Sequence, residues 1–331
     1  MSYTYLLPMK KESKGRTIEL TTLIDSMKVL IATEKPFAKV AVEGICAELK
    51  QAGYETVLLE KYKHDQLLEA VADVDAMIIR SDKVDEEVLA AAKQLKIVVR
   101  AGAGYDNVDL QAATDHNVVV MNTPGQNSNA VAELALGLMV YAMRNFYNGT
   151  SGSELKGKTL GIHAYGNVGR NVARIAKGFG MNVMAFDAYC QDDVMLQEGV
   201  QPVHSCEELY AQANIVSLHI PATPETIQSI NYDLLSKMPK DGLLVNTARK
   251  EVIKEDDLVR FMVERPDFKY VTDIMPGADA KLRELCAERY FATPKKMGAQ
   301  TAEANINAGI AAAKQIVAFF QNGDKRFQVN K

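Results

Sequence analysis

Short apolar runs alternate with longer amphipathic segments along most of the chain. Five runs rich in Val, Ile and Leu come first, at 28–33, 55–59, 76–80, 96–101 and 118–122. A second series of five follows, at 159–164, 182–186, 215–219, 242–246 and 270–273. Several runs lack polar alternation, as expected of parallel strands that are covered by helices on both faces. This order predicts strand–helix–strand units in two separate parallel sheets.

Two longer segments repeat apolar residues with helical spacing. The first, 127–144, is expected to bridge the two sheets. The second, 301–322, is followed by Gly323, a common helix stop. We therefore predict an α/β protein of two doubly wound, Rossmann-like domains with a cleft between them. The predicted boundaries are 27–124 plus 297–331 for one domain and 125–296 for the other, which is inserted in it.

Composition and charge exclude several classes of protein. Lys and Arg number 38 against 42 Asp and Glu, so the net charge of -4 gives no positive field for nucleic acid. The apolar runs are too short to span a bilayer. The 4 cysteines are scattered without zinc-ligand spacing, which predicts no metal site and reduced thiols in a cytoplasmic protein. Residues 1–26 do not resemble a secretory signal, and a second possible start lies at Met27.

A glycine-rich turn between a predicted strand and a predicted helix is typical of dinucleotide binding. From Ala164 to Gly169, two glycines hold the second and third positions of the G-x-G-x-x-G fingerprint, and Ala164 replaces the first. The helix start would offer backbone N–H groups to the phosphates. Asp187 ends the next strand, where a carboxylate accepts the ribose hydroxyls and repels a 2′-phosphate. The pattern predicts NAD, bound through Asp187 and the residues Tyr165, Gly166, Asn167, Val168 and Gly169.

The sequence also predicts the conformation of Ala164 and the role of His163, two residues next to this turn. An alanine at the first glycine position would be held at positive φ, at a cost of about 1–2 kcal/mol. His163 lies within an apolar strand, so we expect a packed core histidine rather than a catalytic one. The plain alternative for the glycine pair is a turn that binds nothing, and the strand–turn–helix context with Asp187 argues against it.

Three further segments resemble the D-isomer-specific 2-hydroxyacid dehydrogenases. They are Arg100-Ala-Gly-Ala-Gly-Tyr-Asp-Asn-Val-Asp, Asn122-Thr-Pro-Gly-Gln-Asn-Ser and Asn246-Thr-Ala-Arg. With Ile79-Arg80-Ser81, they are most similar to the phosphoglycerate dehydrogenases of that family. The resemblance runs in order from residue 27 to the end of the chain, which resembles a short form without the C-terminal regulatory domains of longer members.

The resemblance implies a site for a phosphorylated 2-hydroxy acid. Arg249 would bind the substrate carboxylate and polarise the hydroxyl oxygen, because a guanidinium holds two oxygens in a fixed geometry. Arg80, helped by Lys83, would bind the phosphate, and a surface ion pair is the plain alternative for Arg80. The carboxylate would also meet backbone N–H groups of Ala101, Gly102, Ala103 and Gly104. For the cofactor, the resemblance implies contacts from His219, Pro221, Thr247, Ala248, Asp273, Gly298 and Ala299.

The expected acid/base departs from the family pattern. The family has a histidine in a Pro-His-x-Gly-Ala context, and the segment Pro-Lys-Lys-Met-Gly-Ala places Lys296 there. The family glutamate that orients this histidine is replaced by Ala278, with Asp279 beside it. A lysine amine has no tautomer for a carboxylate to set. A neighbouring carboxylate would also raise the pKa of the lysine, which is already about 10.4. The loss of the glutamate therefore fits the replacement of the histidine by a lysine. We predict that Lys296 is the general acid/base, with a pKa lowered by burial, Arg249 and Lys295.

Three functions stay open at this point. The first is NAD-dependent oxidation of the phosphorylated hydroxy acid, at the entry to serine biosynthesis. The second is a reductase for glyoxylate or hydroxypyruvate. The third is a non-catalytic NAD-sensing protein of the same fold, in which Lys296 would be a solvated hinge residue. Because the relatives dimerise through the bridging helix, we also expect a homodimer that uses exposed apolar residues near 138–141.

Overall fold

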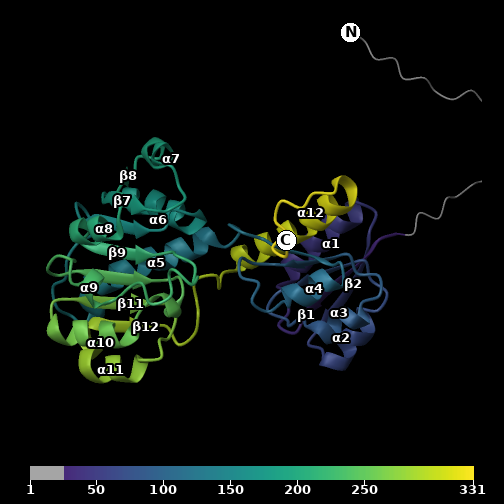
Figure 1. Ribbon diagram of the computed structural model, residues 1–331, viewed down its shortest axis with the longest axis horizontal. Coiled ribbons are helices and arrows are strands. Elements are labelled where there is room, and N and C mark those ends of the chain that lie inside the picture. Colours follow the sequence, from purple (N-terminus) through teal and green to yellow (C-terminus); the bar gives the residue numbers. More distant parts are fainter. Residues whose placement is uncertain (1–25) are drawn as a thin grey trace, which may run out of the picture.

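The computed structural model describes residues 26–331, which form two α/β units (Figure 1). The predicted leading segment, 1–26, lies outside the described residues apart from Ser26. The strands of the first unit are β1 (Lys28–Thr33), β2 (Glu55–Glu60), β3 (Ala76–Ile79), β4 (Ile97–Arg100) and β5 (Val119–Asn122). They form a parallel sheet in the order β2-β1-β3-β4-β5. All five lie within one residue of the predicted runs.

Helices cover both faces of this sheet. Side chains of β1 alternate between two cores: Leu30 packs toward one face and Ile31 toward the other. The helices on the first face are α2 (His64–Ala70), α3 (Glu86–Ala91) and α4 (Leu110–Asp115). Those on the second face are α1 (Lys39–Gln51) and α12 (Ala302–Asn322). The C-terminal helix α12 therefore returns to the first unit, and it stops at Gly323 with φ 66°, as predicted.

The second unit holds a parallel sheet of seven strands in the order β12-β11-β10-β9-β6-β7-β8. Five of them match the predicted runs: β6 (Thr159–His163), β7 (Asn182–Phe186), β9 (Ile215–Leu218), β10 (Leu243–Asn246) and β11 (Lys269–Thr272). Two were not predicted, β8 (Gln201–Pro202) and β12 (Tyr290–Ala292). Both are short edge strands, and a run of two or three residues carries no readable hydrophobic pattern.

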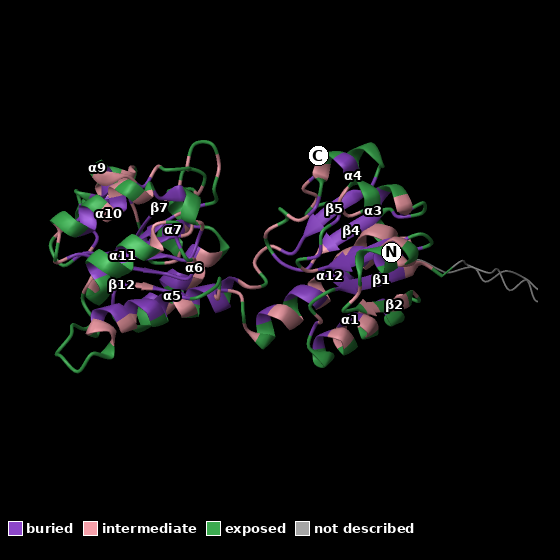
Figure 2. Cartoon of the chain, turned by 90° about the horizontal axis from the view of Figure 1, so that it is seen from below, coloured by how far each residue is buried: buried purple, intermediate pink, exposed green. Residues whose placement is uncertain are grey.

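Helices also sandwich the second sheet, so its strands are buried on both faces (Figure 2). One face carries α5 (Ser128–Met143), α6 (Asn167–Gly178) and α7 (Asp192–Gln197). The other carries α8 (Cys206–Gln212), α9 (Tyr232–Leu235), α10 (Glu255–Glu264) and α11 (Asp279–Cys286). Short 3-10 turns are η1 (Asn145–Tyr147), η2 (Lys250–Val252) and η3 (Ala287–Arg289). The predicted pair of doubly wound α/β units is confirmed.

The helix α5 does not bridge the sheets as predicted. Its apolar side chains belong to the core of the second unit, and the chain crosses between units before Ser128 begins the helix. Leu138 and Met139 are buried in that core, and Val140 and Tyr141 are half-buried. The exposed apolar surface expected near 138–141 is therefore largely used inside the unit itself.

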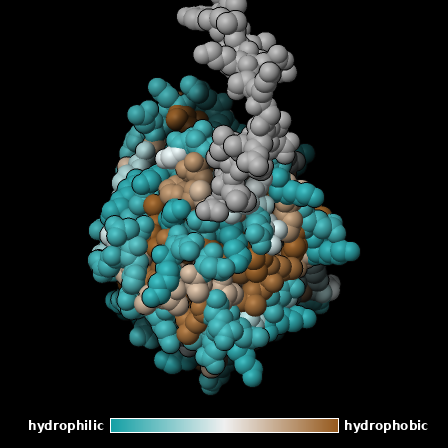
Figure 3. Space-filling view, turned by 90° about the vertical axis from the view of Figure 1, so that its right-hand side faces the viewer, coloured by the Kyte–Doolittle hydropathy of each residue, from teal (hydrophilic) through white to brown (hydrophobic). Residues whose placement is uncertain are grey.

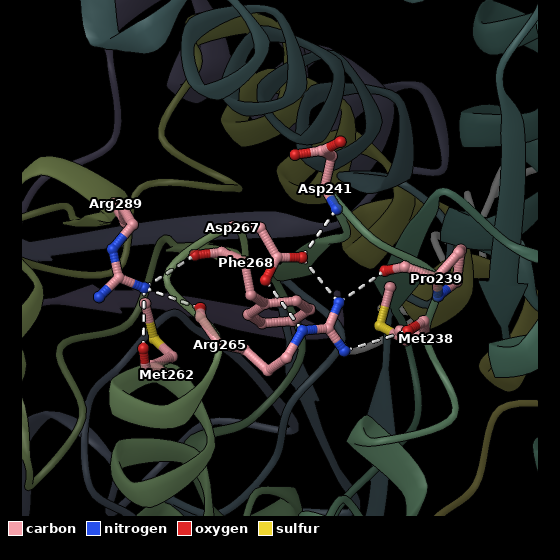
Figure 4. A network of polar contacts seen from close by, with 8 residues as sticks. All are labelled: Met238, Pro239, Asp241, Met262, Arg265, Asp267, Phe268 and Arg289. Atoms are coloured by element: carbon pink, nitrogen blue, oxygen red, sulfur yellow. Dashed lines mark hydrogen bonds and ion pairs between the residues drawn. The ribbon is translucent and has the colours of Figure 1, made fainter.

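A polar network fixes the loop between α10 and β11 (Figure 4). Arg265 donates from Nε and Nη2 to the two carboxylate oxygens of Asp267, over 2.9 and 2.7 Å, and also to the Pro239 carbonyl over 3.0 Å. The guanidinium holds the pKa of Asp267 well below its usual range. Arg289 Nη1 donates to three carbonyls of the same region, including that of Phe268. The network braces the amino ends of β10 and β11, whose opposite ends lead into the candidate site.

Within residues 26–331, no helix combines the length and the apolar character needed to cross a membrane. The end of the molecule formed by the first unit presents mainly hydrophilic residues around smaller apolar patches (Figure 3).

Candidate active site

The candidate site lies where segments that follow the carboxyl ends of strands in both sheets come together. Arg249 follows β10, and its Nη2 lies 3.6 Å from the point that a Cβ on Gly104, after β4, would occupy. A Cβ on Gly125 would similarly lie 3.5 Å from the carboxamide of Asn167 at the start of α6. Ligands of open α/β sheets bind at such strand ends. The two units therefore supply one joint site, which we call the junction.

The turn after β4 offers backbone donors to the junction, but fewer than predicted. The N–H of Ala101 donates to a β3 carbonyl over 2.8 Å, and that of Gly102 to a β4 carbonyl over 2.9 Å. The carbonyls of Gly102 and Ala103 accept hydrogen bonds from residues 122–123, which hold the turn in place. Among residues 26–331, the N–H groups of Ala103 and Gly104 have no partner. Two of the four expected N–H groups are thus available to an anion.

The two side chains predicted to bind a phosphate both have protein partners. Arg80 donates from Nη1 to the carbonyls of residues 35–36, each over 3.1 Å, and from Nη2 to Asn305 Oδ1 over 2.6 Å. Lys83 forms an ion pair with Asp85 at the start of α3, over 2.9 Å, and its side chain is 79% exposed. Arg80 therefore joins α12 to the loop after β1, and Lys83 lies in a surface ion pair.

Arg100, the last residue of β4, is a site candidate that the sequence analysis did not single out. Its Nε donates to the Arg80 carbonyl over 3.0 Å, and its Nη groups have no partner among the described residues. Its Nη1 lies 1.5 Å from where a Cβ on Gly102 would be, so a side chain at position 102 would displace the guanidinium, and φ 149° independently favours glycine there. Burial, Arg80 and Arg249 lower the pKa of Arg100, and Asp106 opposes them. The guanidinium nevertheless stays charged at neutral pH, since arginine is not deprotonated in proteins.

Lys296 and Arg249 meet at one backbone oxygen. Lys296 Nζ donates to the Ala248 carbonyl over 2.8 Å, and Arg249 Nη1 donates to the same oxygen over 3.0 Å. Desolvation around the Lys296 amine and then the charge of Arg249 lower its pKa to about 8, although the residue as a whole is exposed. The charges that act on it come from Arg249 and three carboxylates. Lys295, which we expected to contribute, is exposed.

Among the carboxylates that act on Lys296, the largest effect comes from Asp273, which follows β11. It is fully buried; its Oδ2 accepts from the Gly298 N–H over 2.7 Å, and its Oδ1 has no partner among the described residues. Burial raises the pKa of Asp273, and Lys296 lowers it. Asp279, left open by the sequence analysis, is bound instead to Arg283 and Tyr290, over 2.8 and 2.7 Å. Asp279 therefore does not assist Lys296.

The glycine-rich turn has the geometry that a dinucleotide needs. Gly166 caps α6, and nothing lies within 4 Å of a Cβ placed on it, so a phosphate can approach the helix start. A Cβ on Gly169 would lie 2.3 Å from the Ala164 carbonyl, so glycine there allows α6 to pack closely on β6. Ala164 has φ 78°, as predicted for the first glycine position. Tyr165 is buried beneath the turn, so only its backbone can reach a ligand.

Asp187 follows β7, as predicted, and its carboxylate organises the backbone of the two nearby loops. Its Oδ2 accepts from the Tyr165 N–H over 2.7 Å, and its Oδ1 accepts from the N–H groups of Tyr189 and Cys190 over 2.7 and 2.9 Å. The residue stays half-exposed beside Tyr189, whose side chain is 98% exposed. Asp187 thus holds the loop after β7 close to the glycine-rich turn.

Of two histidines in this unit, His163 is structural, and His219 stays a prediction as a cofactor contact. His163 lies within 3.4 Å of both Tyr210 Oη and Cys206 Sγ, and burial lowers its pKa to about 4, which confirms a packed core histidine. His219 Nε2 lies 2.9 Å from Ser217 Oγ, and its Nδ1 lies 3.5 Å from Thr247 Oγ1. Of the remaining predicted cofactor residues, the structure buries Thr247, Ala248 and Gly298, leaves Pro221 exposed and half-buries Val168 and Ala299.

Among curated proteins, the chain is 36% identical over 269 residues to D-3-phosphoglycerate dehydrogenase of Methanocaldococcus jannaschii. That match covers 76% of this chain and 51% of the relative, so the chain spans about half of that protein's length. It is also 34% identical over 278 residues to hydroxypyruvate reductase of Thermotoga maritima, covering 78% of this chain and 89% of the relative.

Among solved structures, the NAD+-bound 3-phosphoglycerate dehydrogenase of Entamoeba histolytica superposes with a TM-score of 0.82 at 48% identity. The superposition covers 92% of this chain and 99% of the other. The family model "D-isomer specific 2-hydroxyacid dehydrogenase, catalytic domain" matches residues 36–330. With the turn, the arginine after β10 and the two-unit fold, these matches show that the chain belongs to the D-isomer-specific 2-hydroxyacid dehydrogenase family.

Proposed function

We propose that this chain oxidises D-3-phosphoglycerate to 3-phosphohydroxypyruvate with NAD. The observation that carries the proposal is the shared Ala248 carbonyl, which places the Lys296 amine beside the Arg249 guanidinium at the junction. The relatives named as phosphoglycerate dehydrogenases support this substrate, and the cluster of guanidinium groups around the turn after β4 suits one with two anionic groups.

The residues present fit NAD. The open backbone at Gly166 would receive the diphosphate, Asp187 would accept the ribose hydroxyls, and the unpartnered Asp273 Oδ1 would accept from the nicotinamide carboxamide. Bound NAD supplies the acceptor for the hydride that leaves the substrate carbon. The protein holds the substrate, keeps its reacting carbon in position and moves the hydroxyl proton.

Three groups of the chain would act on the hydroxy acid itself. Arg249 would bind the carboxylate and polarise the hydroxyl oxygen, together with the N–H groups of Ala103 and Gly104. Lys296, as the neutral amine, would accept the hydroxyl proton during oxidation and return it during reduction. The lowered pKa of Lys296 matters because it increases the neutral fraction near pH 7.

The phosphate is assigned to Arg100 together with Arg80. Arg100 has unpartnered Nη groups next to the turn that would hold the carboxylate. Arg80 keeps Arg100 in place through its carbonyl and adds positive charge, although its own Nη groups already have partners. Lys83 would contribute only if its ion pair with Asp85 opened.

A substrate panel tests the proposal. NADH formation is measured with D-3-phosphoglycerate and D-glycerate, and NADH consumption with hydroxypyruvate and glyoxylate. We expect the phosphorylated substrate to be preferred by about 100-fold or more in kcat/KM, because a half-buried guanidinium left without its phosphate penalises the other substrates. Arg100→Ala should remove this preference while the Kd for NAD stays the same.

Two outcomes would contradict the proposal. Equal or better turnover of hydroxypyruvate or glyoxylate would favour the reductase, a function that the Thermotoga maritima relative makes the second candidate. NAD binding without turnover of any of the four would favour a sensor.

We also propose that residues 27–124 with 297–331 form the substrate domain and 125–296 the NAD domain, and that the enzyme serves serine biosynthesis as a cytoplasmic homodimer. Light scattering coupled to gel filtration tests the dimer, and a molar mass near that of one chain would refute it.

A further inference from the structure

A charged cluster lies on the side of α6 that faces the loop after β7. Arg170, one residue beyond the glycine-rich turn, donates from Nη1 to Glu198 Oε1 over 2.5 Å. The other carboxylate oxygen of Glu198 accepts from Tyr165 Oη over 2.7 Å. The Arg170 guanidinium also lies over the Tyr165 ring, 5.4 Å from its centroid. Glu198 therefore holds Arg170 in one orientation.

Arg170 lies next to the backbone that Asp187 organises. Its Nη2 is 3.9 Å from Cys190 Sγ, and the Cys190 N–H donates to Asp187 Oδ1 over 2.9 Å. The Arg170 and Glu198 side chains are 39% and 38% exposed, so neither is enclosed in the core. A guanidinium with solvent access thus stands beside the loop that would carry the adenosine ribose.

An arginine near this ribose is the feature by which dinucleotide-binding folds accommodate a 2′-phosphate. Here its charge is matched by a carboxylate, which would also repel a phosphate dianion. We propose that Glu198 is a coenzyme-specificity residue that acts through Arg170. The Glu198–Arg170 pair keeps the guanidinium from a 2′-phosphate, so NAD is preferred over NADP through Glu198 and Asp187 together. The inference rests on the proposed position of NAD at Asp187.

The two carboxylates should then act non-additively. Asp187→Ser removes one repulsive charge but leaves Arg170 paired, so NADP+ should gain little. Adding Glu198→Gln frees the guanidinium, and a new charge-assisted contact should tighten NADP+ binding by about 10- to 100-fold further, equivalent to roughly 1.5–3 kcal/mol. Adding Arg170→Ala to the double variant should remove that gain.

The experiment is a calorimetric titration of the full chain with NAD+ and with NADP+, without substrate. Because no turnover is needed, its result is independent of which hydroxy acid the enzyme oxidises. Glu207→Gln, a matched change at an exposed glutamate in α8, controls for the loss of one negative charge. The thermal unfolding midpoint of every variant verifies the fold, since Asp187 itself is expected to contact NAD+, and Asp187→Asn replaces Asp187→Ser if the loop is disturbed.

The expected result is a fall in the NADP+ Kd that needs Glu198→Gln and disappears with Arg170→Ala. Three results would overturn the proposal: an unchanged NADP+ Kd on adding Glu198→Gln, an equal fall with Glu207→Gln, or a gain that survives Arg170→Ala. Failure of the parent chain to bind NAD+ would instead contradict the proposed NAD site.

Discussion

The lowered pKa of Lys296 leads to a quantitative prediction for the pH dependence of oxidation. Burial and Arg249 lower this pKa from 10.5 to about 8. At pH 7 the Lys296 amine is then neutral in about one molecule in ten, whereas a lysine with the ordinary pKa is neutral in about three molecules in ten thousand. The competent fraction of the enzyme at pH 7 thus rises by roughly 300-fold. The site therefore gains a usable base without the orienting glutamate of the family histidine, because Asp273 and the other carboxylates that act on Lys296 only raise its pKa.

The sign of the pH effect follows from which form reacts. Oxidation needs the neutral amine, so kcat/KM should rise about tenfold per pH unit below pH 8 and level off above it. Reduction needs the ammonium, so its rate should fall above pH 8. Lys296→His should move the acid limb of oxidation down by about 1.5 units, because the ordinary pKa of histidine is about 6.5.

The assay is the pH profile of NADH formation for the parent, Lys296→His and Lys296→Met. Lys296→Met should lower kcat by about 100- to 10,000-fold with an unchanged Kd for NAD. Lys295→Met is the matched control, since that lysine is adjacent and exposed. The reasoning is refuted if Lys296→Met keeps its turnover, or if the acid limb stays at the same pH in Lys296→His.

Other substitutions test the two turns and the buried histidine. Ala164→Gly should raise the free energy of unfolding by about 1 kcal/mol, because φ 78° strains alanine, and an unchanged or lower Tm would contradict this. Gly102→Ala would displace Arg100 and should lower kcat/KM for the phosphorylated substrate at least about tenfold, with NAD affinity retained as the check on folding. Burial lowers the pKa of His163 to about 4, so the folded state binds fewer protons than the unfolded one, and stability falls as the pH drops below about 6.5. Between pH 7 and pH 5, the free energy of unfolding measured with urea should fall by about 2 kcal/mol more for the parent than for His163→Gln. Equal decreases in the two proteins would refute the lowered pKa of His163.

Most of the fold could be predicted from the sequence because helices cover both faces of each sheet. Strands such as β4 and β9 are then apolar at nearly every position, and such runs stand out between polar segments. The edge strand β12 is too short for that signal, and its pairing with β11 is decided by tertiary packing. The course of α5 was misjudged for a related reason: an apolar helix face does not say which sheet it will cover.

Candidate site residues could be predicted from the sequence where they directly follow a strand or lie within a family motif. Arg249 and Asp273 follow strand ends, and the family pattern placed Lys296 without any knowledge of its neighbours. Lys83 stays a prediction, since its ion pair with Asp85 would compete with a ligand. Arg100 had one signal in the sequence: it is a basic residue two positions before Gly102, at the start of a segment that resembles the family.

The sequence by itself determined the two parallel sheets and the glycine-rich turn at positive φ, and it predicted Lys296 in the place of the family histidine. These features depend on local pattern and backbone conformation, which neighbouring residues specify. Only the tertiary structure decided which polar groups have partners and which face the junction. Arg80 is bound to Asn305, 225 residues further along the chain, and Lys296 meets Arg249 at the carbonyl of Ala248. Hydrogen bonding and burial are set by such distant partners, so the available guanidinium and the lowered pKa of the amine emerge only when the chain is folded.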